Sequence, residues 1–182
     1  ITRRMRRVIR LALFQSVLCG VTIATAQAQD FRARVTLPGG NRLPIALDTI
    51  GSPYEVDAPK SRVYAAVASV MKDLQIPLDH DDFAFGTIGN ATLQLRVFFA
   101  GSQLSRYVEC GLGVLGPNAN SWKVHMALMT FVDSLGPNRS RVRVALTAGA
   151  ADPAGATKES TMCGTTGVLE EKISTLLAKK LR

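Results

Sequence analysis

Residues 79–82 form the densest group of side chains in this chain that could perform chemistry, in the order Asp79, His80, Asp81, Asp82. Carboxylate oxygens on one loop are the ligands that hard divalent cations prefer. This acidic segment lacks the spacing and the glycine of an EF-hand loop, and acidic stretches after helices are common as solvated turns. Its four residues are therefore weak candidates for a metal site, and no cofactor is expected.

His125 is the other histidine that could act as an acid or base. It lies on the same face of a predicted strand as Lys123, Ala127 and Met129. A Ser-His-Asp triad is recognised by its geometry in space, and no serine lies here in a recognisable nucleophile motif. We expect His125 to be an ordinary surface or edge histidine and the chain not to be an enzyme.

The segment Gly111-Leu112-Gly113-Val114-Leu115-Gly116 matches the glycine spacing G-x-G-x-x-G. A dinucleotide site would need a strand before this motif and a helix after it. Pro117 and Asn118 follow instead and would break such a helix. A flexible glycine-rich loop is the favoured interpretation.

The chain contains Cys19, Cys110 and Cys163. Cys19 lies in the N-terminal segment, so two cysteines remain in the region expected to fold. A pair in an oxidising compartment predicts a disulfide, which here closes a loop of about 53 residues. A reactive or metal-binding thiol pair is the alternative, but the C-x-x-C spacing and a neighbouring histidine are missing.

Two segments have the periodicity of amphipathic helices. In the first, Asp57 is the expected N-cap, Pro59 lies in the first turn and Pro77 ends the helix. Its apolar stripe consists of Val63, Val67, Val70, Met71 and Leu74. The second helix runs from about Gly167 to Leu181.

Alternating apolar and polar residues predict strands over 31–37, 92–99, 122–132 and 142–148. A turn signal over 38–41 makes 43–47 the expected returning strand of a hairpin, and 83–88 is expected to be a short strand that ends near Gly89 and Asn90. The turn signal over 135–140 joins 122–132 and 142–148 in an antiparallel hairpin. Residues 103–109 are expected to be a short helix, 148–157 a loop and 161–164 an extended segment.

Pairing the strands of that hairpin places Lys123, His125, Arg141 and Arg143 on one face of the sheet. We call this set the basic sheet face. It is the candidate binding face, suited to an acidic envelope protein or an anionic lipid, because each charge contributes roughly 1 kcal/mol at a membrane surface. A solvated sheet face without a partner is the alternative.

These elements predict an α+β fold, in which an antiparallel sheet has two main helices packed on one face and a polar second face. Over about Val56 to Leu181 this layout resembles helix-grip (TBP-like) domains, such as those of the outer-membrane assembly lipoprotein BamC. The segments 107–111 and 163–170, which hold Cys110 and Cys163, resemble a pattern in uncharacterised exported bacterial proteins. The resemblance implies a disulfide and a helix start, and no known active site.

The first 28 residues have the layout of a secretory signal peptide. Five arginines precede an apolar stretch over 11–26 and the cleavage signal Ala26-Gln27-Ala28. The alternative, an uncleaved anchor, needs about 20 apolar residues to span a bilayer, and this stretch is shorter. We therefore expect a single domain over 29–182, periplasmic or secreted, with no transmembrane segment after cleavage.

Charge does not favour a nucleic-acid partner. The chain has 22 basic and 14 acidic residues and a net charge of +8. Without the five arginines of the signal segment, 17 basic residues remain against 14 acidic ones, a net charge of about +3. These are scattered along the chain, whereas a nucleic-acid footprint is clustered.

Two classes of function follow from these observations. The first is a non-catalytic envelope or periplasmic protein with a binding or structural role. The alternative is a carrier of an apolar small molecule or lipid. The carrier would need an enclosed cavity above about 300 Å³. Its expected lining consists of Phe98, Phe99, Met126, Met129 and Phe131.

Overall fold

The computed structural model describes residues 33–40, 43–153 and 159–182 of the chain. The predicted signal peptide over 1–28 lies outside these residues, as do the start of the strand predicted at 31 and most of the loop predicted up to 157. The described residues form a mixed α+β structure made mostly of antiparallel strands.

The long hairpin β11 (Lys123–Gly136) and β12 (Arg139–Ala151) forms the centre of the main sheet. Around it the strand order is β4-β5-β11-β12-β13-β8, and β3 also pairs with β12. The bounds are β3 (Tyr54–Val56), β4 (His80–Asp82), β5 (Thr87–Leu95), β8 (Val108–Glu109) and β13 (Ser160–Thr165). The predicted hairpin is confirmed, and its turn lies at residues 137–138.

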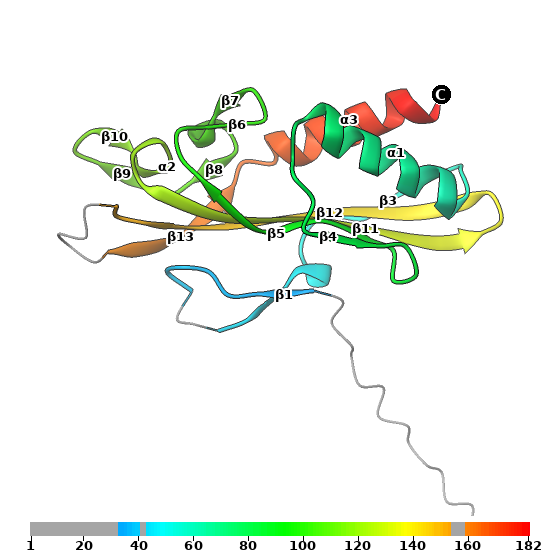
Figure 1. Ribbon diagram of the computed structural model, residues 1–182, viewed down its shortest axis with the longest axis horizontal. Helices are drawn as coiled ribbons and strands as arrows, with labels where there is room; N and C mark the ends of the chain where they lie inside the picture. The colour runs from blue at the N-terminus through cyan, green and yellow to red at the C-terminus, as the bar shows by residue number, and fades with distance from the viewer. Residues whose placement is uncertain (1–32, 41–42, 154–158) are drawn as a thin grey trace, which may run out of the picture.

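Two helices, α1 (Lys60–Asp73) and α3 (Val168–Leu181), lie together on one face of this sheet (Figure 1). The predicted stripe of α1 is buried, with Val63, Val67, Val70 and Met71 fully inaccessible. Leu169, Ile173 and Leu177 of α3 join the same core. Val124, Met126 and Leu128 are its counterparts on β11, because every second residue of a strand points to the same face.

The second face of the sheet is also covered, so the expectation of a polar second face is wrong. A small hairpin, β1 (Arg34–Val35) and β2 (Ile45–Ala46), and a 3₁₀ turn η1 (Leu47–Thr49) lie against it (Figure 1). Their apolar side chains enclose Ala127, Met129 and Phe131, which are at most 1 % exposed. The alternation of β11 is apolar on both sides over this stretch, and a strand of that composition needs two covered faces.

Gly149 on β12 permits this close packing. A Cβ atom at this position would lie 2.2 Å from the carbonyl oxygen of Pro38, far inside van der Waals contact. Only glycine therefore lets the N-terminal segment approach the sheet backbone at this point.

Smaller elements fill the end of the sheet near β8, on the side of the helices (Figure 1). They are the hairpin β6 (Phe98–Phe99) with β7 (Ser102–Gln103), the 3₁₀ turn η2 (Leu104–Arg106), the hairpin β9 (Leu112–Gly113) with β10 (Gly116–Pro117), and the short helix α2 (Asn118–Ser121).

Several predicted boundaries are wrong for local reasons. Residues 83–86 form a turn, and β5 continues from Thr87 through Gly89 and Asn90, where a break was expected. Pro59, rather than Asp57, is the N-cap residue of α1 and makes no side-chain cap hydrogen bond. The helix ends at Asp73, before Pro77, and β12 extends to Ala151 into the predicted loop. Pairing with long neighbouring strands outweighs local turn preference in β5 and β12.

Candidate functional site

The acidic segment is an edge strand and its flank rather than a loop, because His80–Asp82 pair with β5 as β4. Asp79 accepts hydrogen bonds from the backbone N–H of Ala91 at 2.9 Å and from the Thr92 hydroxyl at 2.6 Å. Asp82 accepts one from the backbone N–H of Phe85 at 3.0 Å. These two carboxylates therefore hold turns in place.

The remaining two residues of the acidic segment bond to the sheet and to α1. His80 Nε2 lies 2.6 Å from the Thr87 hydroxyl. The Tyr64 hydroxyl donates to Asp81 Oδ1 at 2.6 Å and lies 3.0 Å from the Thr87 carbonyl oxygen. Burial raises the pKa of Tyr64, and the hydrogen bond and charge of Asp81 raise it further. Tyr64 thus remains a protonated donor that ties α1 to the edge strand.

Within residues 33–40, 43–153 and 159–182, no three His, Cys, Asp or Glu side chains gather closely enough to hold a metal ion. The acidic segment has the residue types of a metal site, but its side chains point to several different partners. A cation needs several of these oxygens directed at one point.

The basic sheet face is divided between the two ends of the central hairpin. Lys123 and His125 pair with residues 151 and 149, whereas Arg141 and Arg143 pair with residues 133 and 131. The eight residue-to-residue steps of strand from 125 to 133 span roughly 27 Å. The apolar stretch between them is covered by the N-terminal hairpin, so the four side chains share one face without forming one patch.

Each end of that face has its own local role. The Arg143 guanidinium donates to the carbonyl oxygen of Asp48 and so fastens η1 to the sheet. Arg141 lies 3.9 Å from the Glu55 carboxylate on β3. At the other end, partial burial lowers the pKa of His125, and the charge of Lys123 lowers it further.

The glycine-rich segment 111–116 forms the β9–β10 hairpin, with Val114 and Leu115 between its two strands. The helix after it, α2, has four residues. A Cβ atom on Gly113 would lie 2.5 Å from the Asn118 side-chain oxygen, so this glycine makes room for the asparagine beneath the hairpin. The glycines thus serve a tight turn and not a phosphate-binding strand–helix unit.

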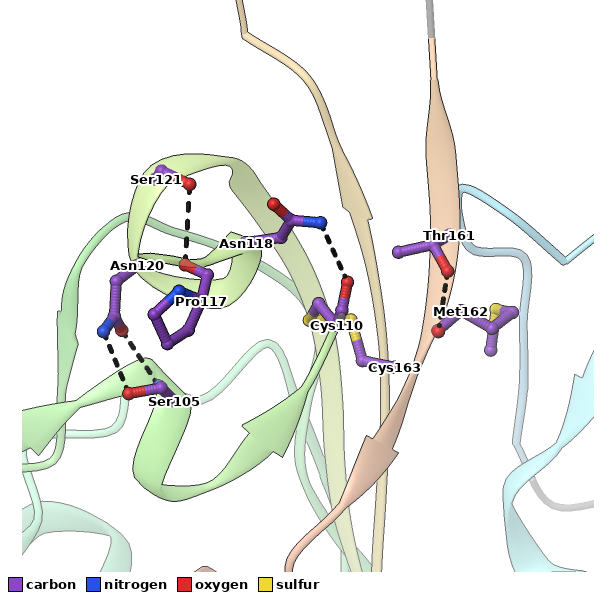
Figure 2. The surroundings of a disulfide bond; sticks show 9 residues. All are labelled: Ser105, Cys110, Pro117, Asn118, Asn120, Ser121, Thr161, Met162 and Cys163. Carbon is purple, nitrogen blue, oxygen red and sulfur yellow. Dashed lines mark hydrogen bonds between the residues drawn. A yellow bond between two sulfur atoms is a disulfide. The ribbon is translucent and has the colours of Figure 1, made fainter. Parts of the chain in front are cut away.

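The disulfide predicted between Cys110 and Cys163 is confirmed (Figure 2), with the two Cα atoms 4.3 Å apart. It joins the base of the β9–β10 hairpin to β13. Asn118 supports the same point, because its side-chain amide donates to the Cys110 carbonyl oxygen at 3.2 Å and its backbone N–H donates to Gly111. The base of the hairpin is therefore fixed on both sides.

Large apolar side chains project from this hairpin, a feature that the sequence analysis did not identify. Leu112 is 82 % exposed, Val114 is 104 % exposed and Leu115 is 89 % exposed. We call these three residues the apolar tip. The signal available in the sequence was the presence of apolar residues between glycines and before a proline, where turns normally carry polar residues.

The five residues expected to line a carrier cavity do not share one space. Phe99 and Met126 belong to the core beneath the helices, whereas Met129 and Phe131 belong to the core beneath the N-terminal hairpin. Phe98 is 63 % exposed. The sheet itself separates the two pairs, because residues 126 and 129 point to opposite faces.

None of the helices in the described parts of the chain combines the length and apolar character that crossing a bilayer requires. No protein-family model matches this chain, and no curated protein matches its sequence.

Proposed function

We propose that this chain is an exported, non-catalytic protein of the cell envelope or periplasm that acts by binding, and that the apolar tip is its contact surface. The helix-grip (BamC-like) character of the fold and the signal peptide over 1–28 are part of this proposal. The Cys110–Cys163 disulfide supports it, since such bonds persist in oxidising compartments.

The exposure of the apolar tip is the observation that carries the proposal. Soluble proteins expose single hydrophobic residues routinely, but a group of three at nearly full exposure marks an interaction surface. The tip is also held at its base by the disulfide and by Asn118. A fixed base lowers the conformational entropy that a partner must remove on binding.

The polar candidates support a binding role over turnover. The carboxylates of the acidic segment and the Tyr64 hydroxyl are used in hydrogen bonds that hold β4, α1 and adjacent turns together. Four of the five expected lining residues are divided between two cores and the fifth, Phe98, is exposed, which favours the docking role over the carrier role.

A double substitution, Val114→Asp with Leu115→Asp, tests this proposal. We expect the variant to fold normally, because both side chains are solvated in the native state. It should no longer co-sediment with membranes prepared from the native host. The matched control is Leu43→Asp with Leu135→Asp, which introduces the same charges at exposed apolar positions elsewhere. Equal binding by the tip variant and the wild type, or equal loss in the control, would contradict the proposal.

A further inference from the structure

The β6–β7 hairpin presents a further exposed hydrophobic residue, in addition to the three of the apolar tip. Phe98 on β6 is 63 % exposed, whereas Phe99 is 8 % exposed and packs edge-on against Tyr107 with ring centroids 6.4 Å apart. Adjacent strand residues point to opposite faces, so burying Phe99 directs Phe98 outward.

This hairpin is also strained. Val97 and Ala100, the residues on either side of the two phenylalanines, have φ angles of 63° and 45°. A left-handed conformation is a genuine outlier for a β-branched residue such as valine. Strain of this kind persists where the surrounding structure enforces it, and it clusters at functional sites. The backbone is held here by hydrogen bonds from Leu104 to Val97 at 2.8 Å and from Phe98 to Arg96 at 2.7 Å.

A groove of about 370 Å³ lies beside this hairpin, between η2 and α3. Tyr107 and Leu176 contribute apolar surface to it, and its charged side chains are Arg106, Lys172, Lys179 and Glu171. Three cations against one carboxylate give the groove a net positive charge. Such a groove is complementary to an anion attached to an apolar body.

The cations of the groove are available to a ligand. Within the residues that the structure describes, the side chains of Arg106 and Lys179 make no hydrogen bond or ion pair. Lys172 Nζ donates one hydrogen bond, to the carbonyl oxygen of Ala100 at 2.8 Å, and an ammonium group has three protons to donate.

Asn120 on α2 connects this region to the apolar tip (Figure 2). Its side-chain oxygen accepts from the backbone N–H of Ser105 at 3.0 Å, and its amide donates to the Ser105 hydroxyl at 2.9 Å. Because α2 follows β10 directly, these bonds tie the β9–β10 hairpin to η2. Both hairpins and α3 lie on the same side of the sheet, opposite the N-terminal hairpin (Figure 1).

We infer that this side of the molecule docks on an anionic phospholipid bilayer. The apolar tip and Phe98 enter the interfacial layer, and Arg106, Lys172 and Lys179 contact lipid phosphates. This inference rests on the proposed function and names the partner of the apolar tip.

The shape and composition of the surface favour a bilayer over a protein partner. Its exposed apolar groups are carried by two separate protruding hairpins, which a fluid interface accepts without a complementary shape. A stable protein interface instead needs a well-packed apolar core, and lysine is depleted there. Two of the three groove cations are lysines.

The test is flotation of the exported chain with vesicles of phosphatidylcholine alone or with added phosphatidylglycerol. We expect binding to the anionic vesicles, weaker by at least about 30-fold for Arg106→Glu with Lys179→Glu, because each of the two lost cations contributes roughly 1 kcal/mol at such a surface and every 1.4 kcal/mol is tenfold. The matched control, Lys123→Glu with Arg141→Glu, makes the same change in net charge on the opposite face of the sheet and should bind like the wild type.

The salt dependence distinguishes the electrostatic contribution of the groove cations from the apolar contribution of the hairpins. Added salt should reduce wild-type binding and should have little effect on what remains in the Arg106→Glu, Lys179→Glu variant, since salt screens exposed charges. Phe98→Ser should weaken binding while keeping its salt dependence.

Three results would overturn the inference. They are an absence of wild-type binding to anionic vesicles, unchanged binding by the groove variant, and a greater loss in the control than in the groove variant. If sedimentation with native membranes depends on the tip, and protease treatment of those membranes abolishes it, the partner is a protein. The proposed function would then stand. Loss of tip dependence on native membranes as well would contradict the proposed function itself.

Discussion

The acidic segment lies at an edge of the main sheet, whereas the apolar tip lies on the separate two-stranded hairpin β9–β10. The two regions differ in how their side chains are used. The acidic segment has the residue types of a metal or acid–base site, yet its side chains bond to Tyr64, Thr87, Ala91 and Phe85 inside the fold. The apolar tip has residue types typical of a core, yet its side chains extend into solvent.

The residue types of a segment and the freedom of its side chains to bind a partner are therefore separate properties. Polar side chains near a sheet edge readily bond to the backbone N–H and hydroxyl groups around them, and Asp79 and Asp81 do so although both residues are exposed. Apolar side chains on a two-residue turn have no neighbours to cover them. The side chains left over after folding are therefore the better guide to binding here.

Among the substitutions that test this difference between the two regions, Cys163→Ser is expected to have the largest effect on stability. Removing the disulfide should lower the free energy of unfolding by about 4 kcal/mol, because the bond closes a loop of 53 residues. Denaturant unfolding measures this loss, and reduced wild-type protein is the control. Hydrogen exchange should rise mainly at β8, β9 and β13 and less at β4. A uniform rise would contradict the separation of the two regions.

A smaller loss of stability, about 2 kcal/mol, is expected from Tyr64→Phe. The substitution removes the donor that the Asp81 carboxylate and the Thr87 carbonyl share, and hydrogen bonds to charged groups are the stronger ones. Tyr107→Phe, whose hydroxyl bonds to the neutral carbonyl of Ala100 at 3.1 Å, should lose less. Equal losses in thermal or denaturant unfolding would argue against a charge-assisted bond at the acidic segment.

His125 should make a small contribution to acid sensitivity. Its pKa is lowered from 6.5 in the folded protein, so the unfolded chain takes up a proton more readily as the pH falls below that value. The free energy of unfolding should therefore fall with pH below about 6.5, through the lowered pKa of the folded state. His125→Gln should flatten this part of the stability profile, and identical slopes would contradict the assignment.

The smallest effect on stability is expected at the apolar tip. Val114→Asp with Leu115→Asp should change the free energy of unfolding by no more than about 0.5 kcal/mol, as for other exposed substitutions. The variant should also bind less of a hydrophobic fluorescent dye than the wild type does. A stability loss as large as that of Tyr64→Phe would show that the tip packs within the protein, and the comparison would fail.

Much of the framework could be predicted from the sequence, because it depends on local periodicity. The stripe of α1, the extent of α3 and the β11–β12 hairpin follow from residues three, four or two positions apart, and the disulfide follows from the pair of cysteines. These features need no knowledge of distant contacts.

The availability of each site was decided by the tertiary structure. Only packing places η1 and the N-terminal hairpin over Met129 and Phe131, separates the basic sheet face into two ends, and directs Tyr64 to Asp81. Likewise, Arg106 and Lys179 are more than 70 positions apart in the chain and share a groove only because η2 lies beside α3. The sequence determined which groups could bond, whereas long-range contacts determined which of them were left free, because hydrogen bonds and burial depend on neighbours in space.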